Sequence, residues 1–128
     1  MQRAFDLPPW PRRWNQALDR NGLALLGTWR KARWPIIHVQ HDSVEPDSTL
    51  RPGQPGHASR EGFEPGEGEP LVRKSVNAAF IGTDLELRLR RLGIDTVVVF
   101  GVSTDICVST TTRVGSNLGF RMVVIGDA

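Results

Sequence analysis

The feature that most constrains the fold is a continuous apolar run at residues 96–100, Thr-Val-Val-Val-Phe. A strand covered on both faces of a parallel sheet has this character, because neither row of its side chains meets water. A second run of the same kind spans residues 121–125. Helix-length segments with short links precede and separate the two runs, which indicates right-handed strand–helix–strand units. The sequence therefore predicts an α/β fold with helices on both faces of a mostly parallel sheet, in three layers.

Two helices are expected around the first run. One begins at Thr83, where Glu86 completes a capping box, and it closes at Gly93. Its expected apolar face consists of Leu85, Leu89 and Leu92. The other follows a sharp turn at residues 101–105, with Thr104 as its cap, and ends at Gly119. Its expected inner face consists of Ile106, Thr110, Val114 and Leu118.

The first half of the chain contains one further helix and one further strand. The helix is expected from Pro11 to about Arg33, with Asn21-Gly22 as its weakest point. Its apolar stripe consists of Trp14, Leu18, Leu25 and Trp29. Residues 35–39 follow as a short buried strand, because they are apolar and β-branched. Residues 42–73 are rich in proline, glycine and glutamate and show no periodicity, so we interpret them as a loop that covers a pocket, with disorder as the alternative.

Composition excludes several classes of partner. The net charge is only +2 and the arginines are scattered, so no nucleic-acid patch is expected. No apolar stretch is long enough to cross a membrane, and no signal peptide precedes the first predicted helix. A single cysteine cannot form an internal disulfide, which favours a reducing, cytoplasmic location.

That single cysteine, Cys107, is the candidate functional residue. It lies just after the turn at the carboxyl end of a predicted strand, which is where parallel sheets bind ligands. The first turn of a helix favours a thiolate and offers free N–H groups to an oxyanion. A small cysteine buried in the core is an equally good interpretation of its position alone.

The sequence around Cys107 resembles the nucleophile motif of the isochorismatase-like and nicotinamidase-like cysteine hydrolases. The motif spans residues 101–108, Gly-Val-Ser-Thr-Asp-Ile-Cys-Val, and is followed by residues 109–113, 118–120 and 123–128 in the family's pattern. Upstream, Lys74 with residues 77–80 and 82–85 resembles the segment that carries the family's catalytic lysine. Either segment alone is a weak signal, but the two together are specific. The resemblance extends over residues 1–128 as one partial domain with a Rossmann-like sheet.

The resemblance implies a catalytic triad of aspartate, lysine and cysteine. Lys74 and Cys107 match two of its members, whereas a surface lysine would be the ordinary interpretation of Lys74 without the resemblance. The aspartate belongs to an Asp-x-Gln-x-x-Phe pattern, of which residues 1–5 supply only the x-Gln-x-x-Phe part. It is therefore expected one position before Met1, and Asp6 does not match it. The first strand and a C-terminal helix and strand of the family domain are also expected outside this fragment.

The resemblance further implies that the backbone N–H groups of Ser103 and Cys107 form the oxyanion hole. The peptide bond between Val102 and Ser103 is expected to be cis. No metal is expected, because the Asp-x-His pattern of nicotinamidases falls on His41 and Ser43, and His38 and His41 would point to opposite faces of a strand. A hydrogen-bonded role is expected for a strand-end histidine, and nothing singles out His57. No cofactor is expected.

Three functions remain open at this point. The first is a hydrolase of a small amide-type (C–N) or isochorismate-like substrate, with low activity in this chain because the aspartate is absent. The second is a catalytically silent member of the same fold that binds a small molecule or serves in assembly. The third, a redox role for Cys107, ranks last because the chain has no resolving cysteine. A small-molecule substrate is the expected partner, and a homo-oligomer is left open.

Overall fold

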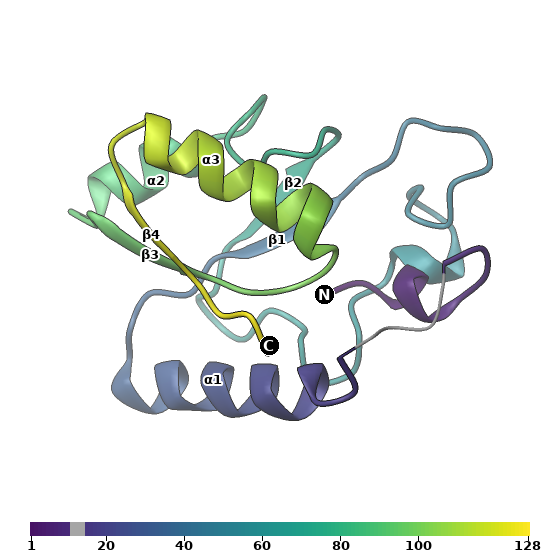
Figure 1. Ribbon diagram of the computed structural model, residues 1–128, viewed down its shortest axis with the longest axis horizontal. Helices are drawn as coiled ribbons and strands as arrows, with labels where there is room; N and C mark the ends of the chain where they lie inside the picture. Colours follow the sequence, from purple (N-terminus) through teal and green to yellow (C-terminus); the bar gives the residue numbers. More distant parts are fainter. Residues whose placement is uncertain (11–14) are drawn as a thin grey trace.

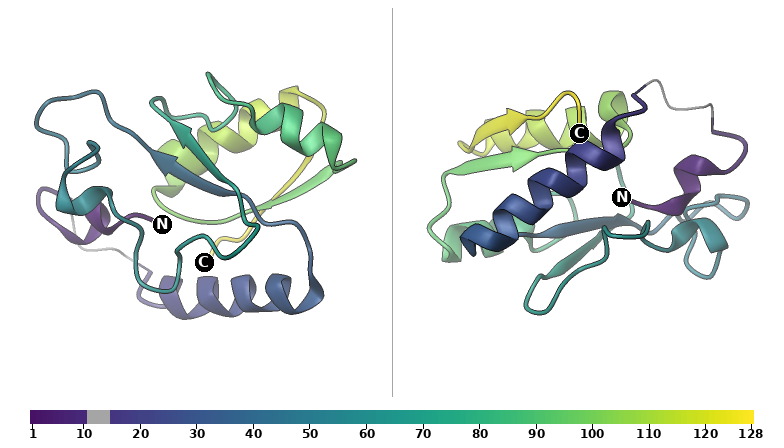
Figure 2. Two further views of the ribbon diagram at one scale, coloured as in Figure 1. Left: turned by 180° about the vertical axis from the view of Figure 1, so that it is seen from behind. Right: turned by 90° about the horizontal axis from the view of Figure 1, so that it is seen from below.

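The computed structural model describes residues 1–10 and 15–128 and contains three layers (Figure 1). Helix α1 (Leu18–Ala32) covers one face of the strands, and helices α2 (Leu85–Arg91) and α3 (Ser109–Asn117) cover the other. The N-terminal segment with the short helix η1 (Arg3–Asp6) lies beside the loop that carries η2 (Pro55–His57), as Figure 2 shows. The three-layer α/β architecture is therefore as the sequence predicted.

Helix α1 begins later than the sequence predicted. Residues 11–14, including Trp14 of the expected stripe, lie outside the described residues. The Asn15 side chain accepts a hydrogen bond from the Ala17 N–H at 2.9 Å, a local bond that competes with helical backbone bonding. The helix continues through Gly22, where an added Cβ would lie 3.0 Å from the Phe100 ring. Glycine therefore allows close packing at the point where the sequence suggested a weakness.

The strands of the first half differ from the prediction in two ways. Strand β1 spans His38–His41 and so begins three residues after Pro35. A second strand, β2 (Leu71–Lys74), lies at the end of the segment predicted to be only loop. It pairs in parallel with β1, with His41 opposite Lys74. The pairing was missed because β2 has only four residues and follows a stretch rich in glycine, proline and glutamate.

The second half keeps the predicted order with shifted boundaries. Strand β3 (Thr96–Val99) is followed by a π-helical turn, η3 (Thr104–Val108), which leads directly into α3. The cap of this turn is Ser103 rather than Thr104. Helix α2 begins at Leu85, and Thr83 accepts a hydrogen bond from the Leu85 N–H at 3.3 Å, so the predicted capping box with Glu86 is wrong.

Three predicted burial patterns are also wrong. Leu92 and Ile106 were placed on inner faces, but both side chains are exposed, and the buried residues of η3 and α3 are Val108, Thr111 and Gly115. The π-turn shifts the face of α3 relative to an ordinary helix, because each of its bonds spans five residues rather than four. Strands β3 and β4 (Arg121–Val124) were predicted to be buried, but β3 is exposed at Thr96 and only half-buried at residues 97–99, and Val123 and Val124 of β4 are exposed.

The described strands form two separate two-stranded parallel sheets, β1–β2 and β3–β4, rather than one continuous sheet. The main core lies between these strands and helices α2 and α3. Its buried members are Val72, Ala79, Phe80, Leu85, Leu89 and Phe120. The rings of Phe80 and Phe120 stack with centroids 5.7 Å apart. A second cluster, of Ala4, Phe5 and Leu50, fixes the N-terminal segment on the long loop.

The long loop is anchored at its end by Glu69. Its carboxylate contacts Arg30 Nε of α1 at 2.7 Å, His38 Nε2 of β1 at 2.7 Å and the Gly66 N–H at 2.8 Å. The Arg30 hydrogen bond is the main reason that the pKa of Glu69 falls to about 2, against the opposing effect of burial. Glu69 thus joins a helix, a strand and the loop. Within the described ranges, no helix has the length and apolar character needed to cross a membrane.

Gly115 and Gly27 form a matched test of packing in helices. A Cβ at Gly115 would lie 2.6 Å from Met122 Sδ and 2.9 Å from the Phe80 ring, whereas nothing lies within 4 Å of one at Gly27. We expect Gly115→Ala to lower the free energy of unfolding by about 1–3 kcal/mol through overpacking. Gly27→Ala should raise it by about 0.5–1 kcal/mol, because alanine favours a helix. Urea unfolding of both variants measures the difference, and a stabilising Gly115→Ala would contradict the packing described.

Glu69 predicts a specific pH dependence of stability. Its folded pKa of about 2 lies below the ordinary value of 4.5, so its contribution is present above pH 4.5 and is lost as the pH falls toward 2. Glu69→Gln should cost on the order of 1–2 kcal/mol at neutral pH, since solvent screens the Arg30 partner. The difference from wild type should shrink in acid. Urea unfolding across this pH range measures it, with the exposed loop variant Glu67→Gln as a control that stays near wild type.

Candidate active site

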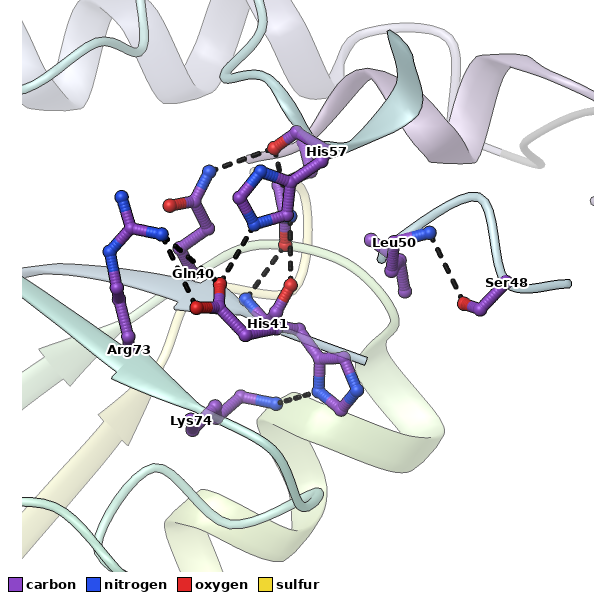
Figure 3. Close-up of polar contacts among 9 residues, drawn as sticks. Gln40, His41, Ser48, Leu50, His57, Arg73 and Lys74 are labelled. Carbon is purple, nitrogen blue, oxygen red and sulfur yellow. Dashed lines mark hydrogen bonds and ion pairs between the residues drawn. The ribbon is translucent and has the colours of Figure 1, made fainter. Parts of the chain in front are cut away.

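The parallel register of β1 and β2 places Lys74 at the site, opposite His41. Lys74 is the last residue of β2, and the alternation of the strand turns it inward while Arg73 is exposed. Only 6% of Lys74 is accessible to solvent, so it is not a surface lysine. Its amine donates to the Val76 carbonyl at 2.9 Å and contacts His41 Nδ1 at 3.0 Å. Figure 3 shows the Lys74 side chain pointing at the His41 ring.

Cys107 reaches the same place from the other pair of strands. After β3 the chain turns at Gly101, whose φ of +138° is a conformation that favours glycine, and the Val102–Ser103 peptide bond is cis. The π-turn η3 then places the half-buried Cys107 with its Sγ 3.4 Å from Lys74 Nζ. The ends of β1, β2 and β3 thus bring a sulfur, an amine and an imidazole together, at the edge where parallel sheets bind ligands.

The backbone near Cys107 is suited to hold negative charge. Ser103 caps η3 and Cys107 lies within it, and η3 continues into α3 without a break. The first turn of a helix leaves N–H groups without intrahelical acceptors, and its positive dipole end favours an anion. The Ser103 hydroxyl donates a hydrogen bond to Asp105 Oδ1 at 3.2 Å, so these two side chains bond to each other.

Cys107, Lys74 and His41 all line one cavity of about 290 Å³. The cavity lies between the two sheets, and its walls include all of β3 as well as Leu25, Leu26 and Trp29 of α1. Phe5 and Gln2 line it from the N-terminal segment. Most of the lining is apolar, with a few polar groups that include Lys74, His41 and Cys107, which is the usual composition of a small-molecule site.

Gln2 is a site residue whose structural role the sequence did not reveal. Its buried side chain accepts from the His41 N–H at 2.9 Å and donates to the His41 carbonyl at 3.0 Å. The same amide nitrogen donates to the His57 carbonyl at 3.0 Å. The side chain of Gln2 therefore bonds to the edge of β1 as a neighbouring strand would. The only sequence signal was the place of Gln2 in the x-Gln-x-x-Phe pattern.

Comparison with known proteins identifies the family. The model of the isochorismatase domain matches residues 1–128. The chain belongs to the isochorismatase family.

Individual members agree with this assignment. The isochorismatase family protein YrdC of Bacillus subtilis is 42% identical over the whole of this chain, which covers 68% of YrdC. A solved isochorismatase-family structure from Chromobacterium violaceum has a TM-score of 0.94 and 47% identity, over 99% of this chain and 66% of that one. The chain therefore spans about two thirds of these two relatives.

Two more distant members have named activities. A streptothricin hydrolase of Streptomyces noursei is 34% identical over 88% of this chain and 40% of its own length. The structure of the N-carbamoylsarcosine amidase of Thermoplasma acidophilum has a TM-score of 0.80 and 26% identity, over 97% of this chain and 77% of that one. Family members of this kind are hydrolases, and this chain shares their fold.

The histidines of this isochorismatase-family chain have separate partners. His38 Nε2 contacts Glu69, His57 Nε2 contacts Asp42 Oδ1 at 2.8 Å, and His41 contacts Lys74. Burial raises the pKa of Asp42, but the bonds from His57 and Arg73 outweigh it and hold the pKa below its usual range. Among residues 1–10 and 15–128, no group of three or more histidine, cysteine and acidic side chains is arranged to hold a metal ion.

Asp6, which does not match the aspartate of the family pattern, has a partner of its own. Its carboxylate contacts Arg60 Nε at 3.2 Å.

The segment after Lys74 is fastened to α3 by Thr111. Its hydroxyl accepts a hydrogen bond from the Ala79 N–H at 3.0 Å, and both residues are buried. Next to it, Phe80 packs against α3 where Gly115 leaves room. The lysine segment and the cysteine helix are therefore joined directly, so the distance between Lys74 and Cys107 depends on this contact as well as on the strands.

We expect Thr111→Val to lower the free energy of unfolding by about 1–3 kcal/mol, because it leaves the buried Ala79 N–H without an acceptor. Thr112→Val is the matched control, since the Thr112 hydroxyl donates to the Val108 carbonyl one helical turn earlier. Its loss should cost less than about 0.5 kcal/mol. Urea unfolding compares the two isosteric changes, and equal effects would show that the Ala79 contact has no special weight.

Proposed function

We propose that this chain is part of a cysteine-dependent hydrolase that acts on a small amide-type (C–N) or isochorismate-like substrate. Cys107 is the nucleophile and Lys74 is its charged partner. The observation that carries the proposal is the 3.4 Å contact between Lys74 Nζ and Cys107 Sγ at the cavity. A buried ammonium beside a sulfur favours the thiolate, which is the nucleophilic form.

The reaction would proceed through an acyl-enzyme. The Cys107 thiolate attacks the carbonyl carbon of an amide, and the negative charge that develops on its oxygen is held by the N–H groups of Ser103 and Cys107. The carbon–nitrogen bond then breaks, and the amine leaves with the proton that came from the thiol. Water attacks the thioester, releases the acid and restores the thiol. The named activities of the amidase and the streptothricin hydrolase among the relatives support this class of reaction.

The proton needs an acceptor. Among the described residues, the side-chain contacts of Lys74 Nζ are those with His41 and Cys107, and neither involves a carboxylate. We place the third member of the triad, an aspartate, at the position before Met1 that the family pattern indicates. The chain by itself would then hydrolyse slowly, because removal of one member of such a unit costs orders of magnitude in rate.

The second candidate is a catalytically silent member that binds a small molecule in the same cavity or serves in assembly, and the largely apolar lining of that cavity supports it. The two candidates differ in one property. The hydrolase needs a reactive Cys107, whereas the silent member has no need of an ionised sulfur.

Alkylation of Cys107 tests the proposal, because the chain contains no other cysteine. We expect Lys74→Met to slow its reaction with iodoacetamide near neutral pH by about tenfold, since the neighbouring charge is lost. Mass spectrometry follows the modification. Lys31→Met is the matched control, because Lys31 is the only other lysine and is exposed on α1.

In a protein extended upstream to include the aspartate, release of acid from a panel of small amides should accompany this reactivity and disappear in Cys107→Ala, whereas the present chain should release acid far more slowly. The same alkylation rate in wild type and in folded Lys74→Met would refute the hydrolase and favour the silent member.

A further inference from the structure

We propose that His41 is a positioning residue, a neutral imidazole that holds the Lys74 ammonium on the Cys107 sulfur. This inference rests on the proposed function and adds to it a residue outside the aspartate–lysine–cysteine set. It follows from the 3.0 Å contact between Lys74 Nζ and His41 Nδ1, together with the way in which both residues are held.

The Lys74 amine has as many acceptors as it has protons to donate. A protonated lysine carries three N–H donors. The described acceptors are the Val76 carbonyl at 2.9 Å, His41 Nδ1 at 3.0 Å and Cys107 Sγ at 3.4 Å. Each acceptor takes one of the three N–H groups, so the bonds to Val76 and His41 leave the third N–H of Lys74 directed at Cys107 Sγ. Without it, the buried ammonium would turn toward another acceptor or admit water.

His41 is in turn fixed by its surroundings. Gln2 bonds to both its backbone N–H and its carbonyl, and the parallel register sets it opposite Lys74 on β2. The backbone of His41 is therefore fixed, which sets the point on β1 from which its ring reaches Lys74. His38 on the same strand has a different partner, because its ring contacts Glu69 on the long loop.

The contact requires one protonation state of His41. Nδ1 can accept from an ammonium only if it carries no proton, so the ring must be neutral, with its hydrogen on Nε2. Burial is the main cause that lowers the pKa of His41, and the charge of Lys74 lowers it further, against the opposing charge of Asp42. The groups that face the ring are thus Lys74 from β2 and Cys107 beyond it on η3, while Asp42 is the next residue and also binds His57.

Protonation of His41 would break the arrangement. Below the folded pKa, an Nδ1–H donor would face the Lys74 ammonium, and the two positive charges would repel each other. Lys74 would then lose its position beside the sulfur. Cys107 reactivity should therefore carry an acid limb that belongs to His41 in addition to the titration of the thiol.

Three substitutions at His41 distinguish a role as hydrogen-bond acceptor from a purely structural role of the side chain. Asparagine places its Oδ1 near the position of Nδ1 and can accept the same bond, whereas leucine offers no acceptor. Glutamine is polar but reaches toward the Nε2 position, so it keeps a hydrophilic group there without restoring the bond. The control is Lys31→Met, which changes an exposed residue of α1 outside the cavity lining. Circular dichroism establishes that each variant is folded.

We expect His41→Leu and His41→Gln to slow iodoacetamide alkylation of Cys107 near neutral pH by about tenfold and to lose the acid limb. His41→Asn should stay within about threefold of wild type and should also lose the limb, because its amide does not titrate. Lys31→Met should keep the wild-type rate and profile. If His41→Leu fails to fold, the comparison of His41→Gln with His41→Asn gives the same answer.

Two results would overturn the proposal. One is a folded His41→Gln or His41→Leu variant with the wild-type rate and pH profile. The other is a His41→Asn variant as slow as His41→Gln, which would mean that the acceptor is irrelevant. The Lys74→Met variant keeps this test separate from that of the proposed function. If Lys74→Met slows alkylation while the His41 variants do not, the hydrolase stands and only the role of His41 is wrong.

Discussion

The buried ammonium of Lys74 is the constraint on which the rest of the site depends. A charge with this little solvent contact is costly unless its hydrogen bonds are supplied from within the protein. The Val76 carbonyl, His41 and Cys107 supply them, and they come from three separate parts of the chain. The site is therefore not a local motif around the cysteine. The site forms only when β1, β2 and β3 end at the same edge and η3 follows β3 there.

Each element at that edge is held by a contact that Lys74, His41 and Cys107 themselves do not make. Glu69 fixes the end of the long loop just before β2 begins, and Thr111 fastens the segment that follows β2 to α3. Gly115 lets Phe80 pack closely beside that bond. These contacts bracket Lys74 on both sides along the chain. Small changes in the core would therefore alter the distance between the Lys74 amine and the Cys107 sulfur.

The sequence predicted the parts of this structure that leave a periodic or family pattern. The run at residues 96–100 located β3, and the motif around Cys107 located the turn after it. Strand β2 was missed because four residues in a loop-like context carry too little periodicity, although the resemblance had already singled out Lys74 at its end. The π-turn was missed because a shift of one hydrogen-bond partner leaves no mark in composition. The exposure of Val123 and Val124 depends on what covers β4, which the local sequence does not encode.

Gln2 illustrates why the partners of His41 were beyond sequence reasoning. An amide side chain can offer a donor and an acceptor side by side, as the backbone of a strand does, but nothing in its identity says that it will. Here it occupies that role because the N-terminal segment is pressed onto the loop. A Cβ at Gly56 would lie 2.6 Å from the Thr49 carbonyl and 2.9 Å from Ala4 Cα. The close approach at Gly56 thus fixes residues near Gln2, Gln2 fixes the backbone of His41, and His41 contacts the lysine. The geometry at the sulfur consequently depends on a glycine that lies outside the cavity lining and has no chemistry of its own.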